Sequence, residues 1–134
     1  MAPRKQGKIV NIGSVAAMAP SPWSGAYASS KAALHAKTDT LRLELSHFGI
    51  GVVAVVPGAI KLNIGQSTAA TYSRMPEWKL FNFPRSKSKS TPTDEFAEQT
   101  VAALLRKKPS AWFSHGQYSF FMSIMYHLPL YVRD

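Results

Sequence analysis

The order of hydrophobic and polar residues predicts alternating strands and helices. The runs Lys8–Ile12 and Gly51–Val56 are short, apolar and rich in β-branched residues, which is typical of buried strands. Between them, Ala26–Phe48 repeats apolar residues at helical spacing, and Gly49 follows as a stop signal. We therefore expect a strand, a long helix and a second strand of a parallel sheet.

A second helix and a third strand are predicted in the last third of the chain. Thr93 is the expected N-cap of this helix, and Ala111–Ser114 is the expected strand. The apolar residues that mark the buried side of the helix are Phe96, Val101, Leu104 and Leu105. The alternation predicts a single α/β domain over residues 1–134 with parallel strand pairing.

Two further segments have distinct characters. Residues 59–92 show no regular pattern, and because connections of this length usually carry function, we interpret them as a substrate loop. Segment 118–132 is apolar, with ten apolar positions among the thirteen of Phe120–Val132. A membrane span needs about 20 residues, so we expect a buried or interfacial helix there. No secretory signal is predicted at the N-terminus.

Composition narrows the classes of function. Hydrophobic residues make up 46% of the chain and charged residues 17%, which suits a packed core rather than a disordered segment. The absence of cysteine excludes disulfides, thiolate zinc sites and a cysteine nucleophile. The net charge of +9 invites a nucleic-acid or membrane partner. The basic clusters Arg4–Lys8, Arg85–Lys89 and Arg106–Lys108 lack interleaved aromatic residues, so we favour a solvated surface over a nucleic-acid site.

Three polar residues are predicted to meet at one edge of the sheet. Tyr27 and Lys31 are four residues apart at the start of the first helix, so they share a helix face. Ser14 lies thirteen residues before Tyr27, just beyond the carboxyl end of the first strand. Ligands bind at that edge in open α/β sheets. The pattern thus predicts a site made of a hydroxyl, a phenol and an ammonium.

Such a trio suits the reduction of a carbonyl or the oxidation of an alcohol. A free tyrosine has a pKa near 10, and a nearby lysine cation lowers it toward the working range of an acid catalyst. Ser14 would hydrogen-bond the substrate oxygen and hold it beside the phenol of Tyr27. Because no side chain supplies a hydride, the reaction needs a nicotinamide cofactor.

The motifs Asn11–Ser14, Tyr27–Lys31 and Val56–Gly58 resemble, in order and spacing, those of the short-chain dehydrogenase/reductase family. The resemblance covers about Lys8 to Ser114 and implies a Rossmann-like, doubly wound parallel sheet. It also implies that Tyr27 is the catalytic acid or base and that Lys31 also bonds the nicotinamide ribose.

The resemblance assigns further cofactor contacts and a partner. Pro57, Gly58 and Ile60 are implied to contact the nicotinamide end of the cofactor through their backbone groups. Helix 26–48 is implied to pack against its copy in a homodimer. The resemblance further implies NADP(H) as the cofactor, with NAD as the alternative, and no metal.

The sequence also departs from the family pattern. The glycine-rich turn that holds the cofactor pyrophosphate is absent, so we expect a partial fold lacking the N-terminal cofactor-binding strands. The edge of the strand at Lys8–Ile12 would then be open, which predicts a marginally stable monomer. At Leu62 the family often has a hydroxyl residue that helps to bind the cofactor, and leucine cannot make that hydrogen bond.

Other candidate residues have ordinary interpretations. We expect a solvent or interface role for His35, although it shares a face with Lys31. Trp23 and Trp78 could line a substrate pocket or pack in the core. The aromatic end, Tyr118–Tyr131, could dock on a membrane, cover the substrate or belong to the core. Three further histidines, His47, His115 and His127, lack the spacing of metal ligands.

Three hypotheses follow for the function. The first is a reductase acting with NADP(H) on a hydrophobic or lipid-like carbonyl, since Ser14–Ala17 and Met125–Pro129 are similar to segments of lipid-active members such as acyl-dihydroxyacetone-phosphate reductases. It would reside in the cytoplasm or at the surface of the endoplasmic reticulum or lipid droplets. The second is an inactive interaction module that keeps the dimer helix. The third is a peripheral binder of anionic membranes.

Overall fold

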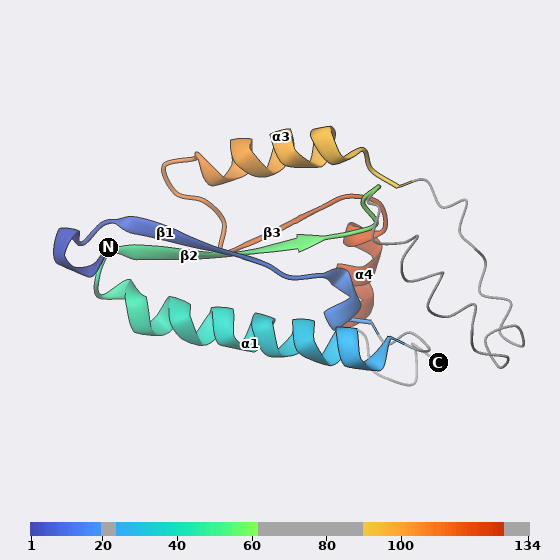
Figure 1. Ribbon diagram of the computed structural model, residues 1–134, viewed down its shortest axis with the longest axis horizontal. Helices are drawn as coiled ribbons and strands as arrows, with labels where there is room; N and C mark the ends of the chain where they lie inside the picture. The colour runs from blue at the N-terminus through green and yellow to red at the C-terminus, as the bar shows by residue number, and fades with distance from the viewer. Residues whose placement is uncertain (20–23, 62–89, 128–134) are drawn as a thin grey trace, which may run out of the picture.

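The computed structural model describes residues 1–19, 24–61 and 90–127. It contains a three-stranded parallel sheet that lies between a long helix on one face and a shorter helix on the other (Figure 1). The elements in chain order are η1 Ala2–Arg4, β1 Gly7–Ile12, η2 Val15–Ala17, α1 Gly25–Ser46, β2 Ile50–Pro57, α3 Thr93–Leu104, β3 Trp112–His115 and α4 Ser119–His127. The predicted α/β class and parallel sheet are confirmed.

The strand order is β1–β2–β3, so β2 is central. Gly7 pairs with Ile50 at the start of β1, and Trp112 pairs with Ala54 at the start of β3. Residues Val52–Val56 are at most 3% exposed because α1 and α3 cover the two faces of β2. The prediction that Gly51–Val56 is a strand buried on both faces is therefore confirmed for all but the exposed Gly51.

The strand predicted at Lys8–Ile12 is observed as β1, but it is less buried than predicted. In the described part of the chain β1 pairs only with β2, so its outer edge is open, which agrees with the open edge predicted for this strand. Ile9 and Val10 are half-buried, and Ile12 is 47% exposed. The β-branched pattern identified the strand, but it carries no information on whether a second neighbour covers its outer edge.

Two predictions for α3 also fail. The N-cap is Pro92, and Thr93 is instead the first helical residue. The hydroxyl of Thr93 donates to the carbonyl of Lys61 at 2.6 Å. Val101 and Leu105 are 53% and 77% exposed. The buried side runs instead through Phe96, Thr100 and Leu104, which lie four residues apart and hence on one helix face. Val101 and Leu105 each follow one position later and point away from the sheet.

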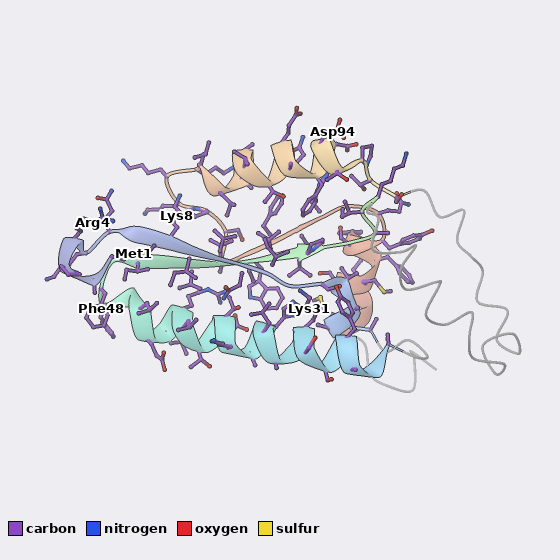
Figure 2. The ribbon with its side chains drawn as sticks, viewed as in Figure 1. Met1, Arg4, Lys8, Lys31, Phe48 and Asp94 are labelled. Carbon is purple, nitrogen blue, oxygen red and sulfur yellow. The ribbon has the colours of Figure 1, made fainter. Side chains whose placement is uncertain are left out.

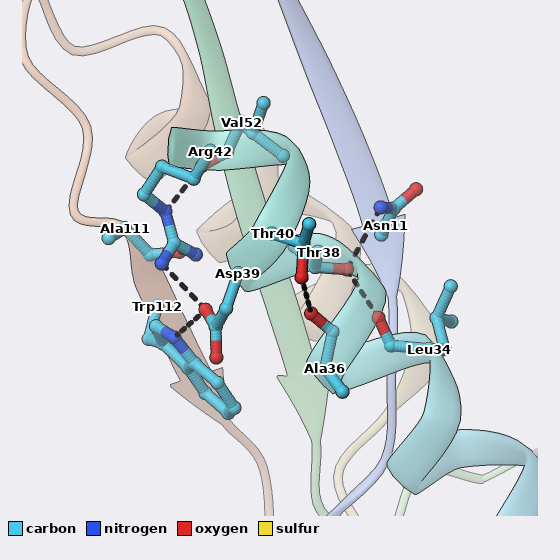
Figure 3. Close-up of polar contacts among 10 residues, drawn as sticks. All are labelled: Asn11, Leu34, Ala36, Thr38, Asp39, Thr40, Arg42, Val52, Ala111 and Trp112. Atoms are coloured by element: carbon cyan, nitrogen blue, oxygen red, sulfur yellow. Dashed lines mark hydrogen bonds and ion pairs between the residues drawn. The ribbon is translucent and has the colours of Figure 1, made fainter. Parts of the chain in front are cut away.

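Hydrogen bonds attach α1 to the strands that it covers (Figure 3). The Asn11 side-chain amide of β1 donates to Thr38 Oγ1 at 2.9 Å. On the other side, one carboxylate oxygen of Asp39 accepts from Arg42 at 2.6 Å and from the indole N–H of Trp112 at 3.1 Å. Arg42 also donates to carbonyls on two segments, Val52 and Ala111. Residues on α1 are thereby held in fixed register with all three strands.

The apolar C-terminal segment begins as a short helix at the carboxyl end of the sheet. The side chains of Phe120, Phe121 and Ile124 on α4 are 78%, 58% and 47% exposed, so a buried helix is the wrong expectation for these residues. No helix in the described ranges has the length and apolar content needed to cross a bilayer.

Several predictions fall on residues outside the described ranges. They concern Trp23, Leu62, Trp78, the basic cluster Arg85–Lys89 and most of the substrate loop 59–92.

Candidate active site

Ser14 lies where β1 ends and the chain turns toward α1. It is the N-cap of η2, and its Oγ accepts a hydrogen bond from Ala16 N at 3.1 Å. This contact fixes the side chain, which is 9% exposed. A hydroxyl has one O–H donor, and the structure gives this one no acceptor among residues 1–19, 24–61 and 90–127. Ser14 can therefore donate to the oxygen of a bound substrate.

Lys31 links the start of α1 to the end of β1. Its Nζ donates to the carbonyl of Ile12 at 2.9 Å and lies 5.8 Å from the ring centroid of Tyr27, one helical turn earlier. Figure 2 shows Lys31 on the side of α1 that faces the strands. An ammonium has three N–H donors, so two remain for a ligand. The Tyr27 ring is 48% exposed and thus accessible to a substrate.

His35 is a site residue that the sequence interpretation missed. It is 8% exposed, and its Nε2 accepts a hydrogen bond from the backbone N–H of Ser14 at 3.3 Å. A solvent or interface role for this residue is therefore the wrong prediction. The i, i+4, i+8 spacing of Tyr27, Lys31 and His35 places all three on one face of α1, but it does not show that His35 approaches Ser14.

The environment of His35 favours its neutral form. Burial away from water lowers the pKa of the imidazole below 6.5, and the Lys31 cation acts in the same direction, whereas Asp39 opposes the shift. The neutral ring has one nitrogen free of a proton, which is the acceptor that the Ser14 amide requires.

The segment after β2 is held against the end of β3. The N–H groups of Gly58 and Ala59 donate to the carbonyls of His115 and Gln117 at 3.0 and 2.9 Å. A Cβ at position 58 would lie 2.1 Å from the Gln117 oxygen, so only glycine permits this approach. The predicted cofactor contacts at Pro57 and Gly58 therefore cannot use backbone N–H groups, because proline has none and that of Gly58 is occupied.

Ile60 differs from its neighbours in this segment. It forms a parallel bridge with Thr91 in which the hydrogen bonds are made by Ala59 and Lys61. The N–H of Ile60 itself points away from that bridge, and the structure gives it no acceptor within the described ranges. Of the predicted contacts after β2, Ile60 thus has a backbone donor available for a nicotinamide.

The structure brings some of the predicted residues together more closely than others. Lys31 Nζ lies over the Tyr27 ring, 5.8 Å from its centroid, and α1 contacts the turn of Ser14 through His35. Ile60 lies at the same carboxyl edge of the sheet but makes no direct bond to the trio in the described structure. The arrangement combines a hydroxyl donor, a phenol and a cation at one edge, which can orient and protonate a carbonyl oxygen.

A family model described as short chain dehydrogenase matches residues 1–73, more than half of the chain. The match includes Ser14, Tyr27, Lys31 and Ile60. The chain belongs to the short-chain dehydrogenase/reductase family. Members of this family are oxidoreductases that use nicotinamide cofactors. The resemblance predicted from the sequence motifs is therefore confirmed.

Known dehydrogenases of this family share both sequence and fold with the chain. The short-chain dehydrogenase fogD of Aspergillus ruber is 37% identical over 122 residues, covering 84% of this chain and 42% of fogD. A short-chain dehydrogenase structure from Streptomyces avermitilis has a TM-score of 0.70 at 22% identity, covering 93% of this chain and 48% of that one. One from Sphingobium yanoikuyae has a TM-score of 0.63 at 25% identity, covering 96% and 50%. The chain spans about two fifths of the length of the curated relatives it matches.

Proposed function

We propose that this chain carries the catalytic residues of an NADP(H)-dependent reductase that acts on a carbonyl of a hydrophobic or lipid-like substrate, or oxidises the corresponding alcohol. The observation that carries the proposal is the position of Lys31. Its ammonium is held by the Ile12 carbonyl beside the ring of Tyr27, and the same strand end presents the hydroxyl of Ser14.

Each residue has a distinct role in the proposed reaction. Ser14 donates its O–H to the carbonyl oxygen of the substrate and holds it beside Tyr27. When bound, a reduced nicotinamide cofactor would supply the hydride that the carbonyl carbon needs. The phenol of Tyr27 gives its proton to the oxygen, so the product is a neutral alcohol, and solvent returns the proton to the phenolate. The Lys31 cation stabilises that phenolate by electrostatic attraction.

The residues present fit the nicotinamide and ribose end of the cofactor. Lys31 keeps two N–H donors for ribose hydroxyls, and the Ile60 N–H is available for a carboxamide oxygen. The Sphingobium yanoikuyae dehydrogenase, 25% identical to this chain, is described in complex with NADPH. That relative supports NADPH rather than NADH as the first cofactor to test.

An open hollow beside the sheet offers a surface of mixed aromatic and polar character. It has a volume of about 550 Å³ and lies between the end of β3, the start of α3 and α4. Its lining combines the aromatic side chains of Tyr118, Phe120 and Phe121 with a comparable share of polar residues: Thr91, Glu95, Ser114, His115, Gln117 and Ser119. The aromatic side chains are the part of this hollow that suits a hydrophobic ligand.

Replacing Tyr27 by phenylalanine tests the proposed function. The variant keeps the ring beside Lys31 but removes the proton donor, so we expect kcat/KM for NADPH-dependent carbonyl reduction to fall by about 100-fold or more. The measurement is NADPH consumption with a panel of long-chain ketones and aldehydes. Ser46→Ala, which removes an exposed hydroxyl at the far end of α1, is the control and keeps its activity. Equal activity of Tyr27→Phe and the wild type would exclude the proposed role.

A further inference from the structure

The backbone at the exit of β1 is held at three consecutive residues, Ile12–Ser14. The carbonyl of Ile12 accepts a hydrogen bond from Lys31 Nζ at 2.9 Å. The amide of Gly13 donates to the Val55 carbonyl of β2 at 2.7 Å. The amide of Ser14 donates to Nε2 of His35 at 3.3 Å. The turn that carries the Ser14 hydroxyl is therefore fixed by β2 on one side and by α1 on the other.

The surroundings of His35 match the size and position of its ring. A Cβ at Gly13 would lie 2.0 Å from His35 Nε2, so the imidazole occupies space that only glycine leaves open. The other side of the ring packs edge-on against the indole of Trp112, with the ring centroids 5.0 Å apart. Asp39 accepts a hydrogen bond from that indole and so holds Trp112 in place. His35 is thus held between β1, β3 and its own helix.

The contact requires one protonation state of the imidazole. A backbone N–H can only donate, so Nε2 of His35 must be unprotonated and the proton must reside on Nδ1. In a doubly protonated ring, Nε2 would also carry a proton, so a second donor would face the Ser14 N–H. Such a ring would break the contact and release one of the three restraints on the turn.

The charged groups that face His35 both come from α1. Asp39 and Lys31 lie one turn to either side, and their effects on the ring oppose each other. From the other elements, a hollow of about 340 Å³ beside the ring is lined by the uncharged Ala17, Met18 and Trp112. Burial therefore remains the dominant influence and keeps the ring neutral.

We propose that His35 is a positioning residue for the reductase site: its neutral imidazole holds the Ser14 amide and thereby fixes the Ser14 hydroxyl toward the substrate oxygen. This inference rests on the proposed function. His35 contacts the backbone of Ser14 and no reacting atom, so it acts through the serine. Its protonation would loosen the turn and lower the rate at acidic pH.

Two substitutions separate the hydrogen bond from the packing. His35→Gln retains an acceptor oxygen at similar reach, and His35→Leu keeps an apolar side chain without an acceptor. Because small displacements of a positioned group are costly, we expect kcat of His35→Leu to fall by about 10- to 100-fold. We expect His35→Gln to restore kcat to within about threefold of wild type. The wild type loses rate as pH falls through the titration of His35, and His35→Gln lacks that acidic limb.

Nuclear magnetic resonance on the 134-residue chain provides a readout that does not depend on turnover. The ¹⁵N shifts of His35 should show the Nδ1–H tautomer at neutral pH. Hydrogen exchange at the Ser14 amide should be at least about tenfold faster in His35→Leu than in the wild type or His35→Gln, because the amide loses its acceptor. The Nε2–H tautomer, or equal Ser14 exchange in all three proteins, would overturn the proposal. The tautomer is read on the wild type, so the result stands even where His35→Leu fails to fold.

The two readouts also separate this inference from the proposed function. If the wild type reduces no carbonyl while Ser14 exchange follows the acceptor at position 35, the reductase proposal fails and the His35–Ser14 coupling is supported. If the wild type is active and neither kcat nor Ser14 exchange responds to His35→Leu, the positioning role is overturned and the reductase proposal stands.

Discussion

Replacing Gly13 by alanine is the sharpest test of the packing at the β1 exit. The added Cβ would lie 2.0 Å from His35 Nε2 and 2.6 Å from its Cδ2, far inside van der Waals contact. Trp112 packs against the ring and blocks its movement in that direction, which leaves the hollow beside the ring as the space into which it can shift. The strain must therefore move either the ring or the backbone, and both movements break the hydrogen bond from the Ser14 amide.

The cost of this substitution has two sources. Overpacking a filled site costs about 1–3 kcal/mol, and a buried amide left without its acceptor costs about 1–3 kcal/mol. Together these give a loss of about 2–6 kcal/mol in the free energy of unfolding. For a domain of this size each kcal/mol shifts Tm by about 3–5 °C, so we expect Tm to fall by about 6–30 °C.

Thermal unfolding followed by circular dichroism measures this effect. Gly51→Ala is the matched control, because the atoms nearest to its new Cβ are 3.6 and 3.9 Å away, which is ordinary contact. In a His35→Ala background, Gly13→Ala should cost at least about 1 kcal/mol less, since the ring it strikes is gone. An unchanged Tm for Gly13→Ala, or an equal cost in the two backgrounds, would refute the reasoning.

Two further predictions concern Lys31 and the pH dependence of stability. In the proposed site Lys31 provides charged donors for the cofactor ribose, and Lys31→Met removes them, so the Kd for NADPH, measured by titration calorimetry, should rise about 10- to 100-fold. Lys37→Met on the exposed side of α1 should leave that Kd unchanged, and equal Kd values for the two variants would contradict the proposed role of Lys31. Because the pKa of His35 in the folded chain lies below its ordinary value of 6.5, the unfolded chain takes up a proton first as pH falls. Stability from the neutral ring is therefore complete above pH 6.5 and is lost as pH falls through the folded pKa. Urea unfolding should show this loss in the wild type and not in His35→Gln, and parallel curves would contradict it.

The sequence predicted the strands and the first helix well because local signals bound them. The β-branched run that became β2 is closed by Pro57–Gly58, and β1 stops before Gly13, so each observed strand lies within two residues of its predicted limits. The open edge of β1 was predicted from the absence of the glycine-rich turn rather than from local pattern, since an edge depends on which other strands are present. Local pattern misplaced Val101 and Leu105, because apolar character alone does not set the rotation of a helix on a sheet.

The same limit applies to the site. The spacing of Ser14, Tyr27 and Lys31 predicted a common edge, and the contact between Lys31 and Tyr27 agrees with it. The role of His35 depends on a tertiary contact, the approach of α1 to the end of β1, that no local spacing reveals. Gly13 carried the relevant clue, because a glycine beside Ser14 can mark the close approach of another side chain.

The most direct test of the account is hydride transfer itself. The chain is incubated with a long-chain ketone and NADPH that carries deuterium at the reactive position of the nicotinamide, and the product is analysed by mass spectrometry. We predict an alcohol with one deuterium on the former carbonyl carbon in the wild type, and about 100-fold less of it or none in Tyr27→Phe. An alcohol without deuterium, equal product from both proteins, or no alcohol from the wild type would contradict the claim that Ser14, Tyr27 and Lys31 form a reductase site.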